Sequence, residues 1–257
     1  MNDLFIGGGG YAGVMFIGVL EYLHEKKLLE LKNLFACSIG TLIGALFASG
    51  IEPKQMLSII LELDLNEIVK YNISNISTNN CILDDSLLEN LIKPLWEIHS
   101  EGVTLSDFST TTGVNINIYA TNVTTNKYIN FNNKDYPDIK LKDAIKASMS
   151  IPFLFQPVEI NNELYIDGCC KNLYGSPPED LYICGYCIYL TTIKNPEKYF
   201  VNVLNSIINS EKPRGTFLIE CFNETDPSMY INLTSLKQKI VLDMYKKGIF
   251  FAKKCLT

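Results

Sequence analysis

Residues 34–50, LFACSIGTLIGALFASG, contribute most to deciding the fold of this chain. An apolar strand over 34–37 is predicted to run directly into a turn at Ser38, and a helix of small residues follows over 39–47. Ser49-Gly50 is a pair that commonly ends a helix. Because a strand at 4–6 and a helix at 14–29 come earlier in the chain, the alternation predicts parallel strands in an α/β sheet.

Ser38 stands where the predicted strand turns sharply into the predicted helix. At such a turn the serine side chain is exposed, and the N-terminus of the next helix points at the substrate oxygen. The positions two before and two after the serine must be small, because strand and helix nearly touch. Ala36 and Gly40 occupy them, although Ala36 departs from the usual G-x-S-x-G. The pattern indicates a nucleophilic serine, and the alternative is a serine that only caps a buried helix.

A run of four glycines follows the first predicted strand. Residues 8–13, GGGYAG, also satisfy G-x-G-x-x-G, the dinucleotide fingerprint, which requires an acidic residue where the second strand ends. That strand ends in Ala36-Cys37-Ser38, and no Gly-Lys-Ser/Thr completes a P-loop either. We therefore interpret the loop as an oxyanion hole, in which backbone N–H groups of Gly8, Gly9 and Gly10 approach a negative oxygen.

The base for this serine is predicted to be a carboxylate. The two histidines are His24, in a charged stretch of the first predicted helix, and His99, at the end of another helix. A histidine at a helix end can bind the last carbonyls and interact favourably with the helix dipole, so neither position is typical of a triad base. Asp167, followed by Gly168 after a predicted strand at 164–166, fits a serine–carboxylate dyad. A plain Asp-Gly turn is the alternative.

The rest of the chain is predicted from its apolar periodicity and turn residues. The predicted elements are a hairpin with strands at 114–120 and 128–131, helices at 87–98, 141–148 and 235–252, and strands at 181–190 and 216–222. Residues 64–103 contain a polar, Asn- and Ser-rich stretch without a sustained period, and we expect a variable cap or loop there. We expect a single domain over 1–257, since no linker or repeat divides the chain.

Composition excludes several classes of function. The chain has 257 residues, 47% of them hydrophobic, and a net charge of −6, which argues against nucleic acid as its main partner. No basic segment precedes the first strand, and no apolar run approaches the roughly 20 residues of a membrane span. The sequence therefore predicts a cytoplasmic protein without a transmembrane segment, with peripheral membrane attachment as the second option. Eight cysteines fit reduced thiols in that compartment.

Two further features have simple interpretations. Cys184 and Cys187 form a C-x-x-C inside an apolar run, which favours a buried strand with two thiols over a zinc site. The predicted terminal helix carries lysines at 237, 239, 246, 247, 253 and 254. A helix packed on the sheet with its lysines in solvent is favoured over one resting on anionic lipid.

Taken together, the motifs resemble those of the patatin-like phospholipases. The similarity covers most of the chain and keeps the order of the motifs: GGGYAG at 8–13, IGVL at 17–20, the turn at Ser38, LSDF at 105–108 and ATNVTT at 120–125 in the middle strands, ASMSIP at 147–152 and YIDG at 165–168. Three positions depart from the family pattern. Ala36 replaces the first glycine of the turn, Cys169 stands where a second glycine is common after Asp-Gly, and Ala12 replaces a basic residue.

The resemblance implies a three-layer α/β/α sandwich with a mostly parallel central sheet. It also implies hydrolysis of acyl esters of phospholipids or related lipids at a membrane surface. Ser38 would be the nucleophile and Asp167 the base, Gly8, Gly9 and Gly10 would bind the oxyanion, and Ala36, Gly40 and Gly168 would support the turns. No metal or cofactor is implied. The alternative, motivated by Ala12 and Ala36, is a catalytically weak or inactive module that binds a lipid or a partner. Head group, acyl chain and oligomeric state stay open.

Overall fold

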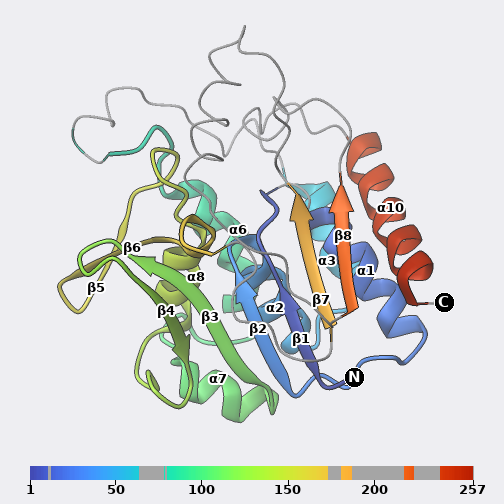
Figure 1. Cartoon of the computed structure of the whole chain (residues 1–257), viewed down its shortest axis with the longest axis horizontal. Helices are drawn as coiled ribbons and strands as arrows, with labels where there is room; N and C mark the ends of the chain where they lie inside the picture. The colour runs from blue at the N-terminus through green and yellow to red at the C-terminus, as the bar shows by residue number, and fades with distance from the viewer. Residues whose placement is uncertain are drawn as a thin grey trace, which may run out of the picture.

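The computed structural model describes residues 1–10, 13–63, 78, 80–172, 181–186, 217–222 and 238–256 (Figure 1). These residues form an eight-stranded sheet in the order β5-β6-β3-β2-β1-β7-β8, in which β4 also pairs with β3. The strands are β1 (Asp3–Ile6), β2 (Asn33–Cys37), β3 (Asn115–Asn122), β4 (Lys127–Asn132), β5 (Val158–Ile160), β6 (Glu163–Asp167), β7 (Leu181–Tyr186) and β8 (Phe217–Phe222).

The centre of the sheet is parallel, as predicted. Parallel pairing joins β2 to both β1 and β3, β1 to β7, and β7 to β8. Strands β4, β5 and β6 add antiparallel pairs at one end. Leu4, Phe5 and Ile6 are all fully buried, because a parallel strand in the middle of an α/β sheet is covered on both faces. This burial explains why β1 appears in the sequence as a continuous apolar run instead of an alternating one.

Helices form a layer against the sheet. They are α1 (Gly13–Glu25), α2 (Ile39–Ala48), α3 (Pro53–Glu62), α6 (Ser86–Trp96), α7 (Leu105–Thr112), α8 (Leu141–Met149) and α10 (Gln238–Leu256), with the 3₁₀ turn η2 (Gly168–Cys170) after β6. Helix α10 contacts β8, α1 contacts β7, α2 contacts β1 and β2, and α8 contacts β3 and β6. The predicted α/β architecture is thus confirmed. The described residues form the central sheet and one helix layer of the sandwich.

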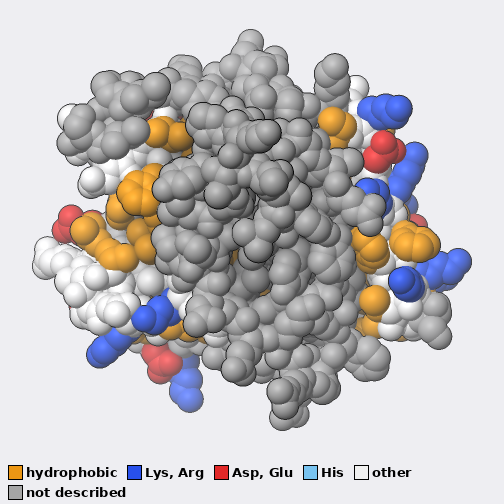
Figure 2. Space-filling model, turned by 45° about the horizontal axis from the view of Figure 1, so that its top comes forward, with side chains coloured by type: hydrophobic (Ala, Val, Ile, Leu, Met, Phe, Trp, Pro, Cys, Tyr) orange, Lys and Arg blue, Asp and Glu red, His pale blue; other side chains and the backbone are white. Residues whose placement is uncertain are grey.

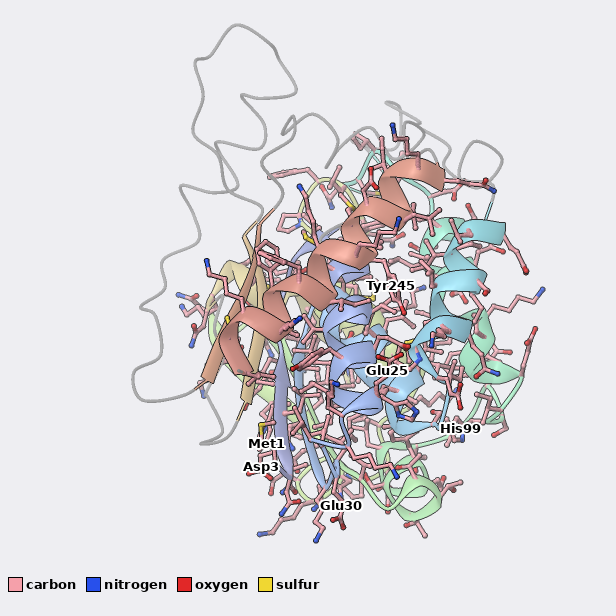
Figure 3. All side chains as sticks on the ribbon, turned by 90° about the vertical axis from the view of Figure 1, so that its right-hand side faces the viewer. Met1, Asp3, Glu25, Glu30, His99 and Tyr245 are labelled. Carbon is pink, nitrogen blue, oxygen red and sulfur yellow. The ribbon has the colours of Figure 1, made fainter. Side chains whose placement is uncertain are left out.

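Helices α1 and α10 pack with their backbones in contact. A Cβ atom at Gly18 would collide with the carbonyl oxygen of Tyr245, and one at Gly248 would collide with the carbonyl oxygen of Met15. Two glycines facing each other therefore set this close approach. The outer side of α10 reaches the surface at the right of Figure 2, where lysine and hydrophobic side chains lie together, and Figure 3 shows α10 crossing in front of α1. None of the described helices is long and apolar enough to cross a bilayer.

The first helix is shorter than predicted. Instead of continuing to residue 29, α1 ends at Glu25, because Lys27 adopts a left-handed conformation with φ of 52°. The N–H of Leu28 then donates to the carbonyl of Leu23 at 3.0 Å, which is the hydrogen-bond pattern of a Schellman motif. A lysine in the position that glycine usually takes gives no signal in the sequence.

One motif lies in a different type of element from the one expected. Residues 105–108, which we placed in a strand, begin α7. The Thr104 side chain accepts from the N–H of Asp107 at 3.1 Å, and the Asp107 carboxylate accepts from the Thr104 N–H at 3.4 Å. This reciprocal pair is a capping box, so the placement in a strand was wrong. Helix α3 was not predicted at all, although Pro53 at its first turn is a common start signal.

The short strand β5 was not predicted either, and the other predicted elements agree with the structure to within a few residues at their ends. The predicted hairpin is β3 paired antiparallel with β4, and its turn contains Asn126 with φ of 55°. The predicted helices at 87–98, 141–148 and 235–252 correspond to α6, α8 and α10, and the late strands to β7 and β8. Residues 187–190 of the strand predicted at 181–190, residues 235–237 of the last helix, and 64–77 and 79 of the predicted cap lie outside the described residues.

Candidate active site

The register of β3 brings Ser38 and Asp167 together. Strand β2 runs parallel to β3 and ends with Cys37 opposite Tyr119. Strand β6 runs antiparallel to β3 and ends with Asp167 opposite Ala120, the next residue of β3. The two strands therefore end facing each other, and the residues at their ends meet although 129 positions separate them in the sequence.

Ser38 occupies a strained turn. Its φ is 54° and its ψ is −135°, a combination that a residue with a side chain rarely adopts and that clusters at functional sites. Three hydrogen bonds hold the turn. The Ser38 N–H donates to Ser148 Oγ at 2.9 Å, the Ser148 hydroxyl donates to the Tyr119 carbonyl at 2.6 Å, and the Thr41 hydroxyl donates to the Ser38 carbonyl at 2.7 Å. The first two bonds tie the turn to α8 and β3.

The positions on either side of the serine differ in how strictly they must be small. A Cβ atom at Gly40 would collide with the carbonyl oxygen of Ile6 and lie 2.6 Å from that of Gly7, so α2 starts directly against the end of β1. Ala36, in contrast, is a regular residue of β2 and is fully buried in the hydrophobic core. Its additional methyl group therefore fits without changing the strand.

The Ser38 hydroxyl donates a hydrogen bond to Asp167 Oδ2 at 2.5 Å. The other carboxylate oxygen, Oδ1, accepts from the N–H of Cys169 at 2.8 Å. The backbone of Asp167 is fixed as well, since its N–H donates to the Ser150 carbonyl at 2.9 Å and its carbonyl accepts from the Thr121 hydroxyl at 3.0 Å. The carboxylate is thus held in one orientation, with one oxygen directed at the serine.

Burial makes Asp167 a stronger base than an exposed aspartate. Asp167 is only 3% exposed. Burial raises the pKa of Asp167 to about 6, while the hydrogen bonds from Ser38 and Cys169 lower that pKa by a smaller amount. A general base works best with a pKa near the operating pH, so this carboxylate is suited to accept a proton near neutrality.

Glycines allow the backbone to close around this pair. A Cβ atom at Gly168 would collide with the Tyr119 carbonyl oxygen. One at Gly8 would collide with the sulfur of Cys169 and lie 3.4 Å from Ser38 Cβ. Gly8 and Gly9 are buried, and Gly10, with φ of 49°, lines the same cavity as Ser38. The glycine loop therefore lies beside the serine, whereas Ala12 lies outside the described residues.

Two cysteines beside the pair were missed as site residues in the sequence. Cys37 Sγ lies 3.4 Å from Cys169 Sγ, and with Asp167 they form the one described group of Cys, His, Asp or Glu whose ligand atoms could together hold a metal. The hydrogen bond to Cys37, together with burial, raises the pKa of Cys169 well above its usual value, so this thiol is protonated. The Ser38 hydroxyl and the Cys169 N–H each already bind one oxygen of Asp167, so a metal at this group would share the carboxylate with the serine.

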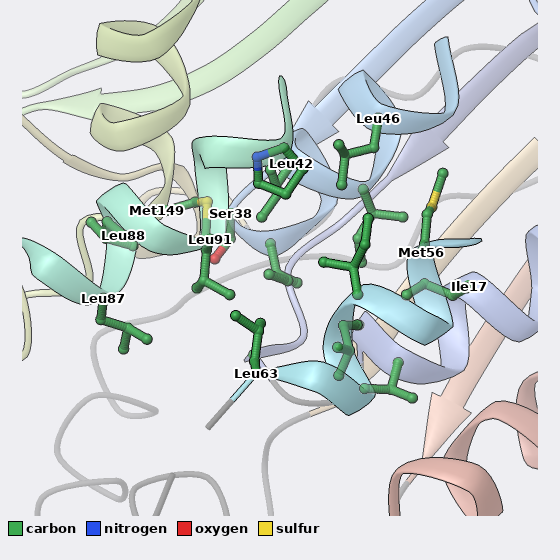
Figure 4. A pocket seen from close by; sticks show the side chains of 18 of the residues that line it. Ile17, Ser38, Leu42, Leu46, Met56, Leu63, Leu87, Leu88, Leu91 and Met149 are labelled. Atoms are coloured by element: carbon green, nitrogen blue, oxygen red, sulfur yellow. The ribbon is translucent and has the colours of Figure 1, made fainter. Parts of the chain in front are cut away.

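Ser38 lines an apolar cavity of about 180 Å³. Figure 4 shows Ser38 with Leu42, Leu88 and Leu91 around it. Among the described lining residues Ser38 contributes the one polar side chain, and apolar residues of four helices make most of the described wall: Val14 and Ile17 of α1, Ile39, Leu42, Ile43 and Leu46 of α2, Met56, Ile59 and Ile60 of α3, and Leu87, Leu88 and Leu91 of α6. The cavity can hold a hydrocarbon chain whose reactive end lies at the serine.

The two histidines lie elsewhere. His24 is exposed at the end of α1, as predicted. His99 is 8% exposed, its Nε2 lies 2.9 Å from Ser49 Oγ, and its ring centroid lies 5.2 Å from that of Phe108. Burial lowers the pKa of His99, so the imidazole is neutral and structural. The predicted C-x-x-C cannot be placed, because Cys187 and the side chain of Cys184 lie outside the described residues.

Comparison with known proteins finds a matching family model and related sequences. The family model "Patatin-like phospholipase" matches residues 4–173. A "Probable lipid hydrolase 463L" of Invertebrate iridescent virus 6 is 28% identical over 175 residues, which cover 65% of this chain and 59% of that protein. "Triacylglycerol lipase ptl3" of Schizosaccharomyces pombe is 28% identical over 172 residues, 60% of this chain and 33% of that protein. The chain thus matches less than two thirds of the length of these relatives.

Solved structures share the fold at low sequence identity. VipD from Legionella pneumophila superposes with a TM-score of 0.57 at 16% identity, covering 99% of this chain and 66% of that one. The type III effector protein ExoU superposes with a TM-score of 0.54, also at 16% identity, covering 99% of this chain and 52% of that one. At this level of identity the comparison concerns the fold alone.

Proposed function

Because the chain belongs to the patatin-like phospholipase family, we propose that it hydrolyses acyl esters of phospholipids or related lipids with a Ser38–Asp167 dyad. The observation that carries the proposal is the 2.5 Å hydrogen bond from Ser38 Oγ to Asp167 Oδ2, made by a serine that lines an apolar cavity. A strained serine alone could be a helix cap. A strained serine bound to a buried carboxylate with a raised pKa has the components of an activated nucleophile.

The reaction proceeds in two halves. Asp167 accepts the hydroxyl proton as Ser38 Oγ forms a bond to the acyl carbonyl carbon, and the carbonyl oxygen becomes an oxyanion. That oxyanion is bound by N–H groups of Gly8, Gly9 and Gly10. When the tetrahedral intermediate collapses, the ester C–O bond breaks and Asp167 returns the proton to the departing alkoxide. Water then attacks the acyl-enzyme, with Asp167 accepting its proton and returning it to Ser38.

The cavity suggests which part of the substrate is bound. The wall that the described residues form is hydrocarbon except at Ser38, so it would exclude a phosphorylated head group and accept the acyl chain. Each methylene that moves from water into such a site contributes about 0.8 kcal/mol. We therefore expect long-chain acyl esters to be preferred over short-chain esters, with the head group outside the cavity at a lipid surface. We retain the cytoplasm, with peripheral contact to a membrane, as the proposed location.

A fluorophosphonate probe tests the proposal directly. It should label wild-type protein at Ser38 and fail to label Ser38→Ala, because only an activated serine reacts. His24→Ala is a suitable control, since this exposed histidine lies away from the dyad and should leave labelling intact. If the wild-type protein does not label, the chain is instead the non-catalytic binding module that the sequence left open. If the wild-type protein does label, mass-spectrometric detection of free fatty acid released from a panel of lipids would identify its substrate.

A further inference from the structure

Helix α10 exposes an aromatic side chain among lysines. Phe250 is 61% exposed, more than any other large hydrophobic residue of the described chain. Its neighbours at three and four positions before and after are Lys246, Lys247, Lys253 and Lys254. Residues at these spacings lie next to one another on a helix surface. Phe250 is therefore surrounded on the helix by four ammonium-bearing side chains.

The exposure of Phe250 follows from how the helix packs. The inner face of α10 consists of Val241, Met244, Tyr245, Gly248 and Ala252, which are buried. Phe250 is not part of this stripe, and Leu242 is also exposed, at 37%. A single exposed hydrophobic residue needs no explanation. A hydrophobic residue at the centre of a cationic face, however, matches a partner surface that is both anionic and able to accept an apolar group.

The charge of this face is opposite to that of the protein. Helix α10 contains five lysines and one acidic residue, Asp243, which gives it a net charge of +4, whereas the whole chain carries −6. The backbone contact of Gly18 and Gly248 with the facing helix also holds α10 firmly against α1. The cationic face is thus presented by a helix with a fixed position, next to α3, which contributes to the wall of the cavity.

We propose that the outer face of α10, made of Lys246, Lys247, Phe250, Lys253 and Lys254, docks the protein on membranes that contain anionic lipids. The lysines would bind lipid phosphates, and the Phe250 ring would enter the boundary between head groups and acyl chains, as in interfacial amphipathic helices. The choice of a lipid membrane over an acidic protein as the partner rests on the proposed function. Phosphatidylserine or another anionic phospholipid supplies the complementary charge.

The binding is measured with the full chain carrying Ser38→Ala, so that no lipid is consumed. The probe is vesicles of phosphatidylcholine with and without phosphatidylserine, in a sedimentation assay. We expect binding to the anionic vesicles only, weakening as salt is added. Each lysine near an anionic surface contributes about 1 kcal/mol, or roughly fivefold in affinity. Lys246→Ala/Lys254→Ala should therefore weaken binding roughly thirtyfold.

A matched control removes the same charge elsewhere. Lys127 and Lys134 are exposed on β4 and the turn after it, and Lys127→Ala/Lys134→Ala should bind anionic vesicles within about twofold of the parent. Phe250→Ser keeps all the lysines, and we expect it to weaken binding roughly tenfold, the effect of removing a partly buried aromatic ring. All variants should unfold at the temperature of the parent, because the substituted side chains face solvent.

Three results would overturn the proposal. They are equal binding to neutral and anionic vesicles, an equal effect of the α10 and control variants, and no binding by the parent. If the parent does not bind vesicles but the wild-type protein hydrolyses a soluble short-chain ester, the proposed function stands. The partner of the α10 face would then be an acidic protein. Vesicle binding without any esterase activity would reject the proposed function and support the docking surface.

Discussion

Replacing Asp167 by asparagine should inactivate the protein and stabilise it at the same time. Asparagine has nearly the same shape, and its side-chain oxygen can still accept from the Cys169 N–H, as Asp167 Oδ1 does at 2.8 Å. It cannot accept a proton from Ser38. Removing a general base typically costs a factor of about 10² to 10⁴ in turnover, and a base that acts as a unit with its nucleophile should be near the upper end.

The stabilisation follows from the raised pKa. Burial raises the pKa of Asp167 from 3.8 to about 6 in the folded protein. Because the folded state holds this proton more tightly than the unfolded chain, the stabilising contribution is complete below pH 3.8 and is lost as the pH rises through about 6. Two pKa units correspond to about 3 kcal/mol. The asparagine variant carries no such charge, so it should gain about 3 kcal/mol over wild type above pH 7 and nothing near pH 3.5.

Thermal unfolding of both proteins across this pH range is the assay. For a chain of this size, 1 kcal/mol shifts the melting temperature by about 2–4 °C, so the variant should melt about 6–12 °C higher at pH 8 and at the same temperature near pH 3.5. Asp138→Asn, at an exposed position, is the matched control and should show no such trend. A difference between Asp167→Asn and wild type that does not change with pH would refute the argument from burial. Wild-type kcat/KM should also fall tenfold per pH unit below about pH 6.

Three further changes test other parts of the site. Ser38→Ala should lower hydrolysis at least about 10³-fold with little change in melting temperature, and residual activity within tenfold of wild type would exclude Ser38 as nucleophile. His24→Ala and His99→Ala should keep kcat within a few-fold, although His99→Ala should melt earlier because that ring is buried against Phe108; a loss as large as that of Ser38→Ala would require a triad. Leu42 lines the cavity, so the larger side chain of Leu42→Phe should occupy part of it, reduce turnover of long-chain esters and spare short-chain esters. An equal loss on both substrates would place the acyl chain elsewhere.

Much of the fold was predictable because parallel strands have a strong signature. Strands β1 and β2 are apolar runs that end at glycine and serine turns, and this pattern can be recognised without any knowledge of the partner strands. The errors arose where a local hydrogen bond decided the conformation. The capping box of Thr104 and Asp107 turned a predicted strand into α7, and the left-handed Lys27 ended α1 early.

The residues of the candidate site were predictable, but their contact was not. Ser38 and Asp167 were recognised from the turns that follow their strands and from the order of motifs. Nothing in the sequence states that Cys37 lies opposite Tyr119 and Asp167 opposite Ala120. That one-residue step on β3 brings the hydroxyl to the carboxylate, and it depends on β6 pairing with the part of β3 that β2 does not reach. Register of this kind is a property of the assembled sheet.

The strength of the proposed base also comes from residues far from it in the sequence. An aspartate in water, with a pKa near 3.9, would be a poor proton acceptor for a serine hydroxyl. The tight turn at Gly168 and the close passage of Gly8 let backbone segments pack against the surroundings of Asp167, since a Cβ atom at either glycine would collide with a neighbour. The enclosure excludes water and raises the pKa of Asp167 to about 6, close to that of an imidazole. In the proposed dyad, the burial that these glycines permit would make the Asp167 carboxylate basic enough to accept the serine proton without a histidine.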